Sequence, residues 1–168
     1  MSIRIRNKEN KTYIVLGSPH SATSFIAKSL QSAGVEMGAK GENFMFSFCQ
    51  DYQFVATNKR ILTAAGGDLY YNIPSEEKIM SVDKSGFIKR LIARKKGKLW
   101  GWKDPVTSLT IKHYLPHLDG DPYLVCVFRK PQKIVNSYKD QEGGRITKKL
   151  IDRYNNGIIS AIKEFCEL

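Results

Sequence analysis

The pattern of hydrophobic positions predicts short strands that alternate with helices. Residues 13–17, "YIVLG", are continuously apolar up to a terminal glycine and rich in β-branched side chains, as is typical of a buried strand. Residues 98–103 and 122–128 form two further short apolar segments, and an Asp-Pro pair ends the first of them. Helical spacing of apolar residues predicts helices in the remaining segments, at residues 23–34, 50–64, 76–96, 107–118, from 131 onward and 145–165.

Apolar strands separated by helices predict an α/β fold with a central parallel sheet. Right-handed crossovers place helices on both faces of such a sheet, so we expect three layers, α/β/α. The length of 168 residues, without an internal repeat or a linker, predicts one compact domain over residues 1–168. Ligands of these sheets bind beyond the carboxyl ends of the strands, so the residues that follow each strand are the first candidates for a site.

The charge balance favours an anionic partner. The chain has 27 Lys and Arg against 16 Asp and Glu, a formal net charge of +11, which leaves nucleotide, nucleic acid, acidic glycan and membrane surface open. The basic run at residues 93–98 is interpreted as a solvated helix end. No apolar stretch has the form of a signal peptide or a membrane span, and the three cysteines lack metal-ligand spacing, so we predict a soluble cytoplasmic protein without a metal site.

The loop after the first predicted strand, "GSPHSATS" at residues 17–24, looks like a phosphate loop without its lysine. In the pattern G-x-x-x-x-G-K-[ST], Ala22 stands at the position of the second glycine and Thr23 at that of the lysine. Because this lysine binds the outer phosphates of ATP, its absence disfavours a nucleotide kinase. A strand, a tight loop and a helix N-terminus still form an anion site, to which Ser21, Thr23 and Ser24 add hydroxyl donors. The alternative that these residues only cap the helix stays open, because Ser and Thr are preferred caps.

Three motifs in the chain resemble those of sulfotransferases that use 3'-phosphoadenosine 5'-phosphosulfate (PAPS). "GSPHSATS" resembles their 5'-phosphosulfate loop G-x-P-[RK]-S-G-T-[ST], with His20 at the basic position and Ala22 at the glycine. "VCVFRKPQKIVNSY" resembles their 3'-phosphate motif, in which Arg129 ends a strand and Ser137 follows eight residues later. "WGWKDPVTSL" resembles the Lys-Asp-Pro stretch of tyrosylprotein and bacterial sulfotransferases and points to Lys103.

The resemblance implies a P-loop NTPase-like sulfotransferase core that binds PAPS and releases adenosine 3',5'-bisphosphate without a metal. It implies transition-state roles for Lys103 and His20, and stacking of Phe25 on adenine, although an apolar residue early in a helix is as often part of the core. The residues that it assigns to the nucleotide are Ser18, His20, Ser21, Ala22, Thr23, Ser24, Phe25, Arg129 and Ser137.

The resemblance leaves the catalytic base open between two acids. Glu42 follows the loop at about the distance of the catalytic Glu in tyrosylprotein sulfotransferases. In a bacterial pattern the acidic positions fall on Cys49 and Gln50, so Asp51 is the nearest substitute.

The acceptor and the assembly are also left open. Small-molecule, glycan and peptide acceptors all fit an unidentified hydroxyl or amine. Members of the family continue beyond such a final helix, so we predict a domain without that C-terminal extension, either as a minimal version, as part of a longer chain, or as a homodimer that pairs its sheet edges. Two other functions remain, a nucleotide-binding module without turnover and a basic nucleic-acid-binding domain, which is disfavoured because no nucleic-acid-binding motif is present.

Overall fold

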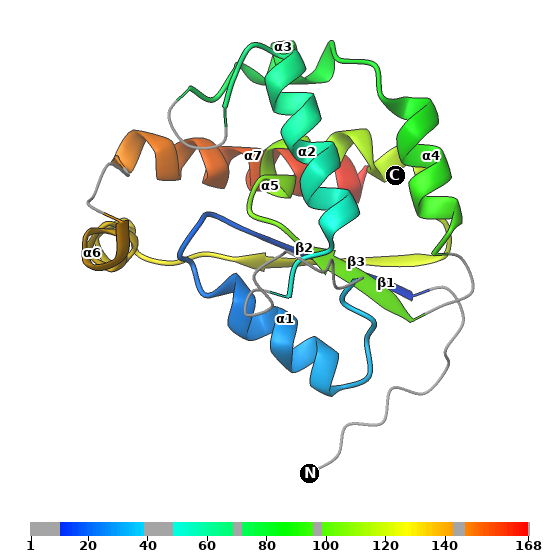
Figure 1. Ribbon diagram of the computed structural model, residues 1–168, viewed down its shortest axis with the longest axis horizontal. Helices are drawn as coiled ribbons and strands as arrows, with labels where there is room; N and C mark the ends of the chain where they lie inside the picture. Colours follow the sequence, from blue (N-terminus) through cyan, green and yellow to red (C-terminus); the bar gives the residue numbers. More distant parts are fainter. Residues whose placement is uncertain (1–10, 39–48, 69–71, 96–98, 143–146, 168) are drawn as a thin grey trace.

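A three-stranded parallel sheet forms the centre of the fold (Figure 1). The computed structural model describes residues 11–38, 49–68, 72–95, 99–142 and 147–167. Strand β1 (Lys11–Gly17) lies in the middle, with β2 (Trp100–Lys103) on one side and β3 (Asp121–Val127) on the other, both parallel to it. The predicted α/β class and the parallel sheet are therefore confirmed, and the three predicted strands are found within two residues of their expected bounds.

The central strand is apolar because both of its faces are buried. Ile14, Val15 and Leu16 are all fully buried, and alternate side chains point to opposite faces of a strand. Ile14 and Leu16 join the larger core, whereas Val15 packs in a smaller core with Ala27. Helix α1 (Thr23–Ser32) covers the smaller core, and the other helices that pack on the sheet lie on the opposite face (Figure 1).

The larger core is built around stacked aromatic rings. Phe54 of α2 (Tyr52–Ala64) stacks on Trp102 with ring centroids 4.2 Å apart, and Tyr114 packs against both rings. Tyr114 lies between two short 3-10 turns, η2 (Ile111–His113) and η3 (Leu115–His117), which follow α5 (Thr107–Thr110). The helix predicted at residues 107–118 is thus divided into one short α-helix and two tighter turns.

The last two helices follow β3 in the chain. Helix α6 (Pro131–Glu142) begins at a proline, which is tolerated in the first turn of a helix. Helix α7 (Lys148–Cys166) is capped by Thr147, whose side chain accepts a hydrogen bond from the Leu150 amide, and it buries one face that includes Tyr154 and Ile158. No helix in the described ranges combines the length and the apolar character needed to cross a membrane.

The single helix predicted at residues 76–96 is wrong. The segment forms two helices, α3 (Glu76–Met80) and α4 (Ser85–Ala93). The carboxylate of Asp83 accepts hydrogen bonds from the amide and hydroxyl of Ser85, at 3.0 and 2.8 Å. Such local bonds favour a turn over a continuous helix, and apolar periodicity alone does not reveal them.

Candidate functional site

The loop between β1 and α1 is too tight for a side chain at Gly17. A Cβ atom there would lie 2.4 Å from Thr23 Cγ2 and 2.5 Å from Ser21 Oγ. The Gly17 amide donates a 2.9 Å hydrogen bond to Ser108 Oγ, and this hydroxyl lies 3.3 Å from the Gly17 carbonyl oxygen, to which it donates. Since Ser108 lies in α5, these bonds join the end of β1 to the helix that follows β2.

The loop enters α1 through two residues in the left-handed conformation. His20 has φ 59° and Ala22 has φ 75°, a region that favours glycine, so Ala22 adopts the conformation expected of the glycine that it replaces in the resemblance. Ala22 is the N-cap of α1, and no side chain accepts a hydrogen bond from the first turn. The alternative that the loop hydroxyls only cap the helix is therefore not supported, and the helix keeps the positive end of its dipole without an acidic residue in its first turn.

Two hydroxyl groups in this loop are buried without a hydrogen-bond partner. Ser18 is 1% exposed and Ser21 is 2% exposed, and among the described residues their Oγ atoms are the buried side-chain polar atoms that no protein group bonds. Burial of a hydroxyl without a partner costs free energy, so such atoms are few in native proteins. Their position at a helix N-terminus fits a phosphate or sulfate group that would accept hydrogen bonds from them.

The first turn of α1 presents three more of the predicted residues. Thr23 is buried and Ser24 is half-buried. Phe25 is 70% exposed. The exposure of Phe25 excludes the reading of this ring as part of the core and leaves it accessible to a flat ligand.

Lys103 occupies the carboxyl end of β2, in register with Val15 of β1. Its side chain is 3% exposed, and burial lowers the pKa of Lys103 to about 8, against the opposing effects of Asp104 and Cys49. At neutral pH the protonated form still prevails by about ten to one. The structure therefore holds a desolvated ammonium group at the edge of the sheet where the loop lies.

Arg129 follows β3 and binds the same loop. Its Nη1 donates a 2.8 Å hydrogen bond to the carbonyl oxygen of His20. The His20 ring meets the Tyr138 ring of α6 edge-on, with centroids 4.5 Å apart, and Ser137 is the preceding residue of that helix. The segments that follow β1 and β3 are thus in direct contact, and the Gly17–Ser108 bonds connect the segment that follows β2.

Of the two candidate bases, one has a structural role and the other lies outside the described residues. Asp51 caps α2 by accepting a 2.8 Å hydrogen bond from the Gln53 amide, and its other carboxylate oxygen lies 3.1 Å from Lys95 Nζ. Asp51 is 1% exposed and Lys95 is 8% exposed. Lys95 belongs to the basic run for which we expected solvation, and that expectation is wrong at this residue because Asp51 pairs with it. Glu42 lies in the segment 39–48, which is not described.

A buried polar network beside Lys103 was not found by sequence reasoning. Asn58 of α2 is fully buried and donates hydrogen bonds to Asp104 Oδ2 and Thr107 Oγ1, at 2.8 and 2.9 Å. Its own Oδ1 accepts from Thr110 and Tyr114, both at 2.7 Å. Burial raises the pKa of Asp104, while the bond from Asn58 opposes that rise. A polar residue at a buried position of an amphipathic helix was the only signal of this network in the sequence.

Taken together, the carboxyl edge of the sheet offers amide, hydroxyl, guanidinium and ammonium donors to one region. These groups can bind a multiply charged anion and stabilise negative charge that develops on it. Within the described residues, no three His, Cys, Asp or Glu side chains are grouped as metal ligands would be. No protein-family model, curated protein or solved structure matches this chain.

Proposed function

We propose that this protein is a sulfotransferase that moves a sulfuryl group from PAPS to a hydroxyl or amine acceptor. The observation that carries the proposal is the pair of buried, unpartnered hydroxyls of Ser18 and Ser21 in a loop that Arg129 also contacts, at the same sheet edge as Lys103. A nucleotide with phosphates at both ends of its ribose would use these donors together. The same proposal assigns the fold to a P-loop-like sulfotransferase core.

The loop would hold the 5' side of the donor. Ser18 and Ser21 would each donate from a hydroxyl, and the amides of residue 20 and residues 22–24 would donate at the N-terminus of α1, while the Ser21 amide bonds the Ser18 carbonyl oxygen. Phe25, exposed on the first turn, would stack on the adenine ring.

Arg129 and Ser137 would hold the 3'-phosphate. Arg129 uses Nη1 for the His20 carbonyl, and the guanidinium has further N–H groups for phosphate oxygens. Because Arg129 binds the loop backbone as well, it would hold the two phosphate subsites at a constant separation. PAPS itself would supply the activated sulfuryl group.

Lys103 would stabilise the charge that develops on the leaving phosphate. Its ammonium group is already desolvated, so little reorganisation is required when the bond to the leaving oxygen breaks. His20 would add a second donor in the protonated state, and Glu42 would accept the proton of the acceptor.

Calorimetric titration with adenosine 3',5'-bisphosphate tests the donor site. We expect micromolar binding that needs the 3'-phosphate, so 5'-AMP and ATP with magnesium should bind at least about tenfold more weakly. Transfer of labelled sulfuryl groups from PAPS to a mixed set of acceptors then tests turnover. Binding without any transfer would favour the nucleotide-binding module, and equal affinity for ATP would reject the donor assignment.

A further inference from the structure

Helices α2 and α4 enclose a groove on the larger-core side of the sheet, away from the carboxyl-edge loop (Figure 1). Its cavity volume is about 190 Å³. One face of each helix forms a wall, with Leu91 at a buried position. The residues that line the groove are Tyr52, Gln53, Ala56, Thr57, Arg60, Phe87, Arg90, Leu91 and Arg94.

Three exposed arginines give the groove a strong positive charge. Arg60 comes from α2, and Arg90 and Arg94 come from α4 and its C-terminal end. Neither helix contains an Asp or Glu, and no acidic residue lines the groove among the described residues. Asp51, directly before α2, is already paired with Lys95, so it does not neutralise the arginines.

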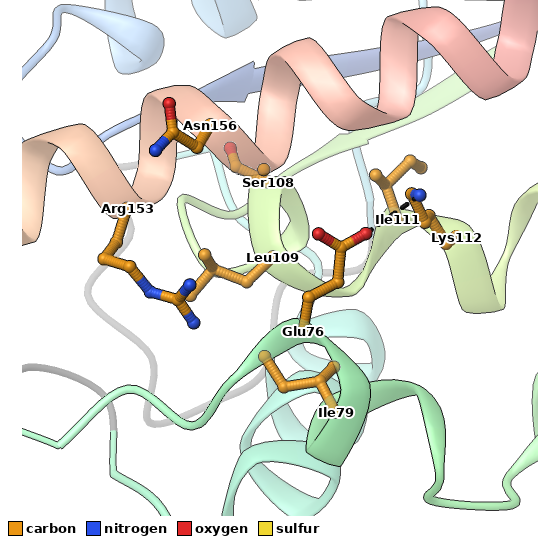
Figure 2. Close-up of a pocket in the computed structure, with 9 residues that line it drawn as sticks. Glu76, Ile79, Ser108, Leu109, Ile111, Lys112, Arg153 and Asn156 are labelled. Atoms are coloured by element: carbon orange, nitrogen blue, oxygen red, sulfur yellow. Dashed lines mark ion pairs between the residues drawn. The ribbon is translucent and has the colours of Figure 1, made fainter.

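A second hollow, between α3, α5 and α7, shows the opposite arrangement (Figure 2). There Lys112 Nζ lies 2.8 Å from the Glu76 carboxylate and 3.0 Å from that of Glu164. Arg153 donates a hydrogen bond to the carbonyl oxygen of Pro74. The cations of this hollow are therefore matched within the protein, whereas the α2–α4 groove presents its cations to the outside.

The groove also carries aromatic and neutral polar groups. Tyr52 is 53% exposed and Phe87 is 39% exposed, and the guanidinium of Arg60 lies 6.0 Å from the centre of the Phe87 ring. Gln53 adds an amide from α2, whereas the buried Thr57 hydroxyl donates to the Gln53 carbonyl oxygen at 2.7 Å. Aromatic rings favour the apolar face of a sugar ring, and the Gln53 amide can bond its hydroxyls.

We propose that the α2–α4 groove binds an acidic saccharide that carries sulfate or carboxylate groups. Guanidinium groups bind such anions through paired hydrogen bonds. No residue that lines the groove belongs to the proposed donor site, so this proposal stands apart from the sulfotransferase function.

The observations favour a saccharide over a single-stranded nucleic acid. Nucleic acids are bound on successive aromatic platforms, one for each base. The groove has two aromatic rings, Tyr52 and Phe87, which come from different helices and do not form a row of successive platforms.

Fluorescence titration of the full chain with a labelled heparin hexasaccharide tests the proposal. The double variant Arg90→Ala/Arg94→Ala should lose at least about tenfold in affinity, because two charged contacts are removed. The control variant Lys28→Ala/Lys163→Ala removes the same charge from exposed positions on α1 and α7 and should lose less than about twofold. A neutral maltohexaose should not bind.

Three results would overturn the groove assignment. They are equal losses in both double variants, equal binding of maltohexaose, and tighter binding of a charge-matched single-stranded oligonucleotide that the groove variant abolishes. Calorimetry with adenosine 3',5'-bisphosphate separates this proposal from the donor site, because the groove variant should keep wild-type affinity for the nucleotide. Saccharide binding without nucleotide binding would support the groove and reject the sulfotransferase function.

Discussion

Two buried polar regions lie beside each other in this protein and differ in how their hydrogen bonds are satisfied. Asn58 bonds the side chains of Asp104, Thr107, Thr110 and Tyr114 at 2.7–2.9 Å. In the loop before α1, the equally buried hydroxyls of Ser18 and Ser21 bond no protein group. The first region is complete within the protein and stabilises the fold, whereas the second has hydrogen-bonding capacity that a ligand can use.

Ser108 and Lys103 lie between the network around Asn58 and the loop before α1. Ser108 bonds Gly17 and so positions the loop, while Lys103 pairs in register with β1 and adds a buried charge. The network around Asn58 helps to hold Lys103 in place, because Asp104, which bonds Asn58, directly follows Lys103 in the chain. Substitutions in the network should therefore affect stability, and substitutions in the loop should affect binding.

The largest effect is expected for Asn58→Ala. This change leaves Asp104 buried without its amide partner and removes the acceptor of Thr110 and Tyr114, so we expect a loss of about 3–5 kcal/mol in the free energy of unfolding. Urea unfolding followed by circular dichroism measures it. A loss below about 1 kcal/mol would mean that the network contributes little, and the comparison would fail.

Lys103→Met should stabilise the protein while it abolishes the proposed sulfuryl transfer. The pKa of Lys103 is lowered by burial to about 8 from 10.5, so its charge destabilises the fold below about pH 8, and stability rises as the folded state loses the proton between pH 8 and 10.5. We expect the variant to be more stable by about 3 kcal/mol at pH 7.

Unfolding at pH 7 and at pH 10.5 distinguishes this effect from better packing. The advantage of Lys103→Met should shrink toward zero at the higher pH. An advantage that is equal at both values would show that charge burial at Lys103 is not its cause.

Arg129→Ala should weaken nucleotide binding more than it weakens the fold. Arg129 is exposed, and a charged hydrogen bond contributes about 1.5–3 kcal/mol, which corresponds to a loss of about tenfold to a hundredfold in affinity for adenosine 3',5'-bisphosphate. Calorimetry gives the affinity and thermal unfolding gives the stability. Lys130→Ala, at the next position of the chain, is the matched control and should bind normally. Wild-type affinity in Arg129→Ala would reject the site.

The smallest effect on stability is expected for Ser18→Ala. The Ser18 hydroxyl has no partner in the protein, so its removal should change the free energy of unfolding by less than about 1 kcal/mol and can raise it. Affinity for the bisphosphate should nevertheless fall by at least about tenfold, because a hydrogen bond to a charged phosphate contributes about 1.5–3 kcal/mol. A large loss of stability with unchanged affinity would place Ser18 with Asn58 as a structural residue.

The elements were largely predictable because their signals are local. The apolar runs of β1 and β3 and the amphipathic face of α7 each depend on residues close in the chain. The break between α3 and α4 was missed because it depends on the side-chain bonds of Asp83, and apolar spacing does not report such bonds.

The sequence by itself determined the alternation of strands and helices and placed candidate anion-binding residues after each strand, because periodicity and strand ends are local properties. Only the tertiary structure decided which of these residues meet. The contact of Arg129 with His20 spans 109 positions and that of Ser108 with Gly17 spans 91. The burial of Lys103 also arises from packing between distant segments, which removes water from its ammonium group. The same kind of packing brings the arginines of α2 and α4 together in one groove.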